Sequence, residues 1–355
     1  MDGKPTLTLT HHFRDLPDPR LAPLCEHELL DIIVIAVCAV ICGQHSWTDI
    51  AFYGQDHYAW LKTFLRLPNG IPSHDTFRYV FTRLDPEAFQ RCFAAWIGAL
   101  SQATDLQHIA IDGKALRGSR QGGKAALHLV SAWATHNHLT LGQVAVADKS
   151  NEITAIPRLL ELLDVSGAIV TIDARGCQKD MQETRTEHLD RTVGQDEGSY
   201  WETVDLGHGR RAVRTSLLVT ELEAIRDREL WQDWHGLCLA VNERTIAGVT
   251  SVEAGYYLGS LHGTVADYAR VIRDHWGIEN SCHWILDVTF REDHCRNRPE
   301  HGAENLAWLR SRALSLLKND TTCDRSIRAK SAKALAEHDF WLQLLSRVSG
   351  EKEGA

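Results

Sequence analysis

The stretch Ile109-Ala110-Ile111-Asp112-Gly113-Lys114 decides the fold class, because a short apolar run rich in β-branched residues ends there on a carboxylate. A second run of this kind, Ile169-Val170-Thr171-Ile172-Asp173-Ala174, ends the same way. We therefore predict that Asp112 and Asp173 each stand at the end of a strand. A third carboxylate, Glu279 in His275-Trp276-Gly277-Ile278-Glu279-Asn280, lies inside a helical pattern.

Acids at the ends of two neighbouring strands, joined by an acid from a helix, form a pattern typical of a divalent metal site. Mg²⁺ takes oxygen ligands and is bound by a few carboxylates together with substrate phosphates. Two such ions can stabilise the attacking and the leaving oxygen of a phosphodiester. The pattern therefore predicts phosphoryl transfer on nucleic acid, supported by Mg²⁺ or Mn²⁺ bound to Asp112, Asp173 and Glu279.

The environment of Glu279 follows from the spacing around it. Residues that step by three or four positions lie on one side of a helix. The set comprises Ile272, Trp276, Glu279, His283, Leu286 and Phe290. Most members are apolar, so we expect this stripe to face the core, where Glu279 would need a partner. A salt bridge to Arg273 or His275 is the alternative to a metal ion.

The pattern of the chain divides it into three regions and indicates an α/β protein. Residues 1–102 read as a helical domain with its own core, and Ser73 is expected to cap a helix over residues 74–84. Residues 103–318 read as strands at 107–111, 126–134, 140–147 and 168–172, a helix at 152–163, a β-rich insertion at about 195–262 and a final helical part. Residues 319–355 read as a charged tail.

Composition restricts the function less than these motifs do. The net charge of −9 argues against a general polyanion binder, yet basic residues cluster locally, for example at Arg291, Arg296 and Arg298. The longest apolar run, residues 32–42, is too short to span a membrane and predicts a buried helix. Nine scattered cysteines without a Cys-x-x-Cys motif favour reduced thiols and a cytoplasmic location.

Simpler interpretations exist for each motif. Asp112-Gly113 is also a common turn dipeptide, and Asp173 is also suited to cap a helix that begins near residue 176. The group Cys282, His283, His294 and Cys295 invites a zinc interpretation, but its spacing fits no standard finger.

Longer motifs around these acids resemble those of a known family. They are Ile111-Asp112-Gly113-Lys114-Ala115-Leu116-Arg117-Gly118-Ser119, Thr171-Ile172-Asp173-Ala174-Arg175-Gly176-Cys177-Gln178, His275-Trp276-Gly277-Ile278-Glu279-Asn280 and Phe290-Arg291-Glu292-Asp293. Together with Gly70-Ile71-Pro72-Ser73-His74-Asp75-Thr76-Phe77, they resemble, in the family's order, the H-repeat-associated transposases. These are insertion-sequence transposases of the DDE class.

The resemblance implies a ribonuclease-H-like catalytic core that follows an N-terminal helical domain. It implies that Asp112, Asp173 and Glu279 hold two metal ions for strand cleavage and strand transfer. The substrates would be double-stranded DNA at the element ends and target DNA. Action on two ends implies a homodimer on DNA in the bacterial cytoplasm, at the nucleoid. Lys114, Arg117 and Arg120 are candidates for phosphate contacts because of their position beside the first acid.

Two departures from the family pattern stand out. A Tyr, an Arg and a Lys flank the glutamate in the wider group, whereas Ile272, His275 and Leu286 stand at those offsets here. The segment from Met181 to Ser199 is almost without apolar residues, so we expect that a deletion has removed the fifth core strand. Two alternatives to an active transposase therefore remain: a decayed remnant that only binds DNA, and a metal nuclease without strand transfer.

Overall fold

The computed structural model describes residues 8–101, 108–120, 125–146, 152–163, 165, 167–172, 199–207, 209–220 and 235–346. The chain divides into two compact units, one formed by residues 1–168 and 277–355 and the other by residues 169–276. Each contains a sheet and at least one helix, so the mixed α/β class is confirmed. Within the described residues, no helix is long and apolar enough to cross a membrane.

The first unit begins with helices, as the sequence predicts. They are α1 (Thr8–His12), the short η1 (Ala22–Leu24), α2 (Leu29–Ile41), α3 (Trp47–Asp56), α4 (Tyr58–Leu61), α5 (His74–Arg83) and α6 (Pro86–Ser101). Ser73 caps α5, because its hydroxyl accepts a hydrogen bond from the Thr76 amide. Ser46 and Asp49 form a reciprocal capping box at the start of α3.

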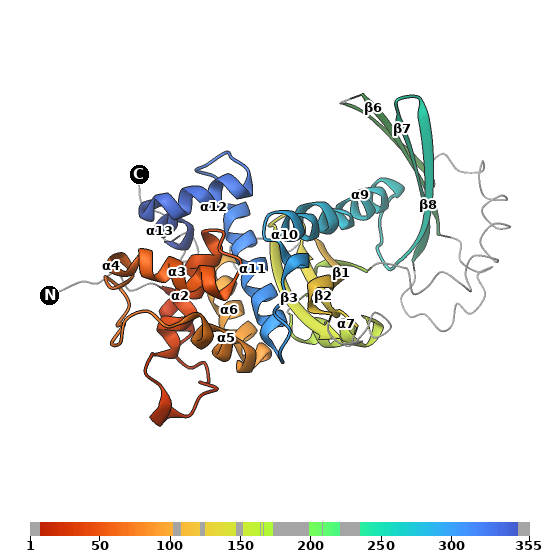
Figure 1. The fold of residues 1–355 in the computed structure, drawn as a ribbon. Helices are drawn as coiled ribbons and strands as arrows, with labels where there is room; N and C mark the ends of the chain where they lie inside the picture. The colour runs from red at the N-terminus through yellow and green to blue at the C-terminus, as the bar shows by residue number, and fades with distance from the viewer. Residues whose placement is uncertain are drawn as a thin grey trace. The chain divides into compact units, whose positions relative to one another are not determined.

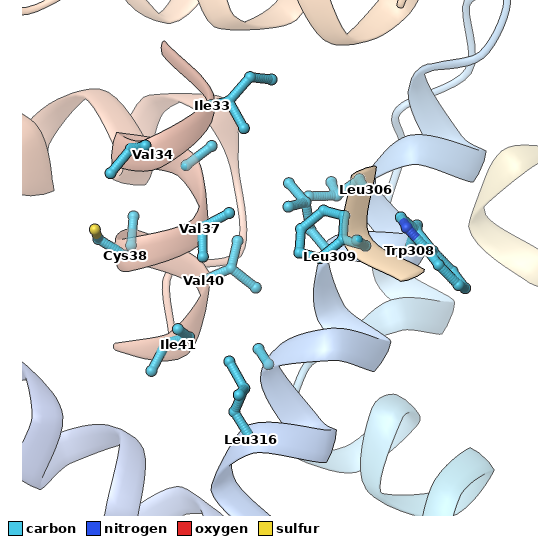
Figure 2. Close-up of a cluster of buried hydrophobic side chains, with 14 of the residues drawn as sticks. Ile33, Val34, Val37, Cys38, Val40, Ile41, Leu306, Trp308, Leu309 and Leu316 are labelled. Carbon is cyan, nitrogen blue, oxygen red and sulfur yellow. The ribbon is translucent and has the colours of Figure 1, made fainter. Parts of the chain in front are cut away.

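Helix α2 is the centre of the core of this unit. Every residue from Asp31 to Ile41 is buried, which confirms the buried helix predicted from the apolar run. Helix α11 (Gly302–Asn319) packs against it. Figure 2 shows Leu306 and Leu309 of α11 pointing towards Val37, while Trp308 points the other way. On that side the Trp308 ring meets Phe93 of α6 edge-on.

Three antiparallel strands follow the helices along the chain. They are β1 (His108–Leu116), β2 (Leu127–Ala134) and β3 (Leu139–Val146). Helix α7 (Glu152–Glu161) packs on β2 and β3, and α11 also contacts β3 (Figure 1). Leu159 of α7 lies where a side chain at Gly142 would project, and Ser315 of α11 accepts a hydrogen bond from the Thr140 amide. Covered strands lose almost all solvent exposure, which explains the buried run along β2.

The segment that reads as a charged tail contains two packed helices, α12 (Ile327–Ala336) and α13 (His338–Ser346). Trp341 and Leu344 of α13 belong to the same apolar core as α2. Lys330 of α12 is buried, and its ammonium donates hydrogen bonds to the carbonyls of Leu317 and Asp320 at 2.9 and 2.6 Å. The charged group therefore holds α12 against the end of α11.

In its described residues, the second unit contains the short β4 (Ile169–Ile172), an antiparallel meander and one helix. The meander consists of β5 (Tyr200–Gly207), β6 (Arg210–Val219), β7 (Gly236–Ile246) and β8 (Val249–Gly259). Helix α9 (Val265–His275) contacts β5, β6 and β7, and its Tyr268 packs against Gly236 and Gly259. The β-rich character predicted for this stretch is confirmed.

Candidate active site

Asp112 lies in the interior of β1, not at its end. The strand continues to Leu116, and Asp112 faces Ser131 of β2 in the register. The prediction of a strand end is therefore wrong, because the pairing with β2 carries the strand through the Asp-Gly dipeptide. The Asp112 carboxylate accepts a hydrogen bond from the Gly113 amide at 2.8 Å, and its side chain remains 12% exposed.

Glu279 opens a π-helical turn, η7 (Glu279–His283), which continues into α10 (Trp284–Val288). The amide of Trp284 donates to the carbonyl of Glu279, five residues earlier. At the other end of this turn His283 is buried, and its Nδ1 lies 3.3 Å from Oδ2 of Asp112. The contact holds the turn that carries Glu279 against β1. Single π turns of this kind are frequent at functional sites.

The prediction of a core-facing stripe is confirmed for its buried members Ile272, His283, Leu286 and Phe290. It is wrong for Trp276 and Glu279. Trp276 is 42% exposed and Glu279 is exposed as well. The α-helix ends at His275, and the wider π turn shifts the buried face to Ile278 and Cys282. Glu279 is thus exposed to solvent.

Lys114 forms a nearly buried ion cluster with two carboxylates. Its ammonium pairs with Glu292 and, at 2.6 Å, with Asp287. Burial alone would lower the pKa of Lys114, but the charges of Glu292 and Asp287 outweigh it and hold that pKa above the ordinary value. Burial in turn raises the pKa of Asp287 despite Lys114. The cluster ties β1 to α10 and to the short η8 (Glu292–His294).

After β1, the short η2 turn (Arg117–Ser119) packs against η8. The two segments are so close that a Cβ added at Gly118 would lie 2.3 Å from the Cys295 carbonyl oxygen. Arg117 lies 3.5 Å from Asp293 and its side chain is 80% exposed. Arg120 is exposed too. Both guanidinium groups are therefore open to a ligand, whereas Lys114 is occupied by its two acids.

Asp173 falls outside the described residues, and so does most of the segment 181–199 in which we expect the missing strand. The strand that precedes Asp173 is described: Thr171 of β4 is hydrogen-bonded to Nδ1 of His275 at 2.8 Å. Within the described ranges, no three His, Cys, Asp or Glu side chains are grouped to hold a metal ion. Burial raises the pKa of the Cys282 thiol to about 12.

Comparison with known proteins places the chain in a class. Residues 10–97 match the model of the DDE_Tnp_1-associated domain, and residues 103–316 match the model of the transposase DDE domain. The protein therefore belongs to the transposases with a DDE domain.

Relatives narrow this to the H-repeat-associated transposases. The "H repeat-associated putative transposase YhhI" of Escherichia coli K12 is 34% identical, with 95% of this chain and 97% of the relative covered. The "Putative transposase YncI" of Escherichia coli O157:H7 is 35% identical, with 96% and 95% covered. A piggyBac transposase synaptic complex with hairpin DNA superposes with a TM-score of 0.36 at 10% identity, covering 98% of this chain and 78% of that one, too weakly to carry an argument.

The sequence pattern did not predict the contacts that hold β1 against η7, α10 and η8. It placed His283 on a core-facing stripe and made Lys114 a candidate for DNA contacts. In the structure His283 lies beside Asp112, and Lys114 is paired with Asp287 and Glu292. One signal was present in the sequence: His275 and His283 stand four positions before and after Glu279. The partners of Lys114 lie more than 170 positions away along the chain, beyond the reach of any local pattern.

Proposed function

We propose that this protein catalyses metal-dependent cleavage and strand transfer at the ends of an insertion sequence, with Asp112, Asp173 and Glu279 as the catalytic and metal-binding acids of a ribonuclease-H-like core. The observation that carries the proposal is the pair of histidines around Glu279. His283 contacts Asp112, and His275 is bonded to Thr171, two positions before Asp173. These contacts support the proposal because each histidine stands four positions from Glu279 along the chain.

The donor set suits the proposed metal. All three proposed ligands are carboxylates, which hard cations such as Mg²⁺ and Mn²⁺ prefer. The Glu279 carboxylate is exposed, and that of Asp112 is partly exposed and oriented by the Gly113 amide. When bound, two such ions would stabilise the charge on the attacking and leaving oxygens of a phosphodiester.

The protein's own side chains supply position and charge. Lys114 fixes β1 against α10 and η8, which sets where Asp112 points. We assign phosphate contacts to the exposed Arg117 and Arg120, and a positioning role to Lys114. The substrates are double-stranded DNA at the element ends and target DNA, and action on two ends requires a homodimer on DNA.

The test is cleavage of a DNA fragment that carries both flanks of the gene, by the purified full-length protein with Mg²⁺ or Mn²⁺. We expect metal-dependent nicks at defined positions, reduced more than about 100-fold in Asp112→Asn, Asp173→Asn and Glu279→Gln. Glu253→Gln, an exposed residue of β8, is the matched control and should cleave normally.

Other outcomes separate the alternatives. Folded protein that binds the flanks without cutting them would contradict the proposal and favour the decayed remnant. Cuts at unrelated sequences, with no joined products, would indicate a nuclease without strand transfer.

A further inference from the structure

A polar pocket lies in the first unit. Its volume is about 530 Å³, within the range of ligand pockets. Its walls come from the start of α3, from α5, from η8 with the loop that follows, and from α11. The lining comprises His45, Ser46, Trp47, Thr48, His74, Asp75, Arg78, Arg291, His294, Cys295, Arg296, Asn297, Leu306 and Arg310.

The pocket carries an excess of positive charge. Four arginines line it against a single acid, Asp75, and that acid is paired with Arg78 at 2.8 Å. Within the described part of the chain, Arg291, Arg296 and Arg310 form no ion pair. An uncompensated group of arginines attracts an anion, and the planar guanidinium suits phosphate oxygens.

Four buried polar atoms in the wall have no hydrogen-bond partner among the described residues. They are Nε of Arg310, Nδ1 of His45, Nε1 of Trp47 and Nδ2 of Asn297. Arg310 is only 1% exposed, and another of its nitrogens, Nη2, donates to the His45 carbonyl at 3.0 Å. A buried guanidinium with an unused donor and no counter-ion is costly unless a ligand supplies the missing oxygen. Burial, and then the charges of Arg310 and Arg291, lower the pKa of His45.

The backbone supports the same conclusion. Arg291 has a left-handed φ of 53°, which is uncommon for a residue with a side chain and recurs at functional sites. Ser46 caps α3 at the rim, so amides at the start of that helix add partial positive charge. Neither feature would suffice alone, but both lie beside the arginines.

We infer that this pocket binds a backbone phosphate of the DNA on which the proposed transposase acts, outside the three catalytic acids. The inference rests on the proposed function for the identity of the ligand. Arg291 and Arg296 would contact the phosphate from the exposed loop, and Arg310 would supply the buried donor. Such a contact positions the duplex and carries no sequence information.

The test compares Arg291→Asn/Arg296→Gln with the wild-type full chain. Asn is chosen at 291 because it tolerates a left-handed backbone. The control is Arg83→Gln, an exposed arginine of α5 that lies over the Tyr79 ring and outside the pocket. Binding of a fluorescent duplex from the gene's flank, and of an unrelated duplex of equal length, is measured without divalent metal at several salt concentrations.

We expect the double variant to bind both duplexes on the order of tenfold more weakly, with the slope of log K against log salt reduced by about two. Its melting temperature and the behaviour of Arg83→Gln should match the wild type. Unchanged affinity and slope in the double variant would overturn the inference, while cleavage by the wild type would still support the proposed function. Wild-type protein that binds DNA but never cleaves it would contradict the proposed function. The slopes of log K against log salt would still show whether the pocket binds a DNA phosphate.

Inorganic phosphate separates the two sources of the anion. If phosphate raises the melting temperature of the wild type but not of the variant, and DNA affinity is the same in both, the pocket holds free phosphate and the DNA inference is wrong.

Discussion

The strands β1–β3 and the strands β5–β8 are both paired antiparallel, but their exposure to solvent is opposite. In the β1–β3 sheet nearly every residue of β2 is buried between packed helices. In the β5–β8 sheet most of β5 and the first half of β8 are exposed, including Trp201 and Val252. Antiparallel pairing alone therefore does not distinguish the sheets, and the helices that cover them do.

This difference in exposure explains why the residues of β1 and of the turn after it can be held rigidly. Asp112, Lys114 and Gly118 belong to β1 and the turn after it, and each is fixed by a contact from the distant segment 283–295. Contacts of this kind require close packing from several sides. In the described part of the second unit, α9 is the helix that contacts the exposed sheet, and the long β7–β8 hairpin of that sheet ends in solvent.

The largest contrast should appear when a tryptophan is removed from each sheet. Trp133→Ala in β2 removes a side chain that is 1% exposed and should lower the free energy of unfolding by about 3–5 kcal/mol. Trp201→Ala in β5, at 44% exposure, should change it by less than about 0.5 kcal/mol. Urea unfolding followed by circular dichroism measures both. Equal losses would break the comparison.

Loss of Lys114 should be nearly as costly. Lys114→Met leaves Glu292, whose side chain is 2% exposed, without its counter-ion, which should cost about 3–5 kcal/mol and impair cleavage. The double variant Lys114→Met/Glu292→Gln should recover part of the stability, because the buried charge is gone. In the exposed sheet, Arg214→Ala should cost at most about 1 kcal/mol. A Lys114→Met protein with wild-type stability would refute the positioning role.

A smaller effect is expected for a methyl group added beside the site. Gly118→Ala places its Cβ 2.3 Å from the Cys295 carbonyl oxygen, a backbone atom that cannot move freely, so we expect a loss of about 1–3 kcal/mol and slower cleavage. Gly207→Ala, at the end of β5, meets nothing within 4 Å and should leave stability and cleavage unchanged. The melting temperatures and cleavage rates of the two variants are compared with those of the wild type. Equal values for the two variants would contradict the prediction.

The smallest effect should come from a surface ion pair of the exposed sheet. A hydrogen bond from Arg214, together with its charge, lowers the pKa of Asp205. The stabilisation is therefore present above the unfolded pKa of about 3.9 and is lost as the pH falls through the lowered folded pKa. Asp205→Asn should reduce the dependence of unfolding on pH below about 4, and salt should weaken the effect. A large loss of stability at pH 7 would show that this sheet depends on its surface charges.

Local patterns in the sequence predicted most of the elements. The apolar run at 32–42, the Ser73 cap and the strands at 126–134 and 140–147 appear as helix or strand close to the predicted bounds. The family follows from the motifs around Asp112, Asp173 and Glu279 and is confirmed by the domain matches. These signals are local because caps, strands and acid motifs depend on neighbouring residues.

Only the tertiary structure decided how the site residues are held. A helical period of 3.6 residues placed Glu279 in the core, but a π turn turns it to solvent, and no pattern marks that turn. The sequence suggested that Lys114 is a surface base. In the structure it is paired with Asp287 and Glu292, which lie far from it along the chain. The sequence showed a net negative charge with local clusters of basic residues, and folding brought Arg78 and Arg310 to the same pocket as Arg291 and Arg296. The sequence by itself determined which chemical groups are present, and packing between distant segments determined which of them meet, because contact energies depend on distance in space and not along the chain.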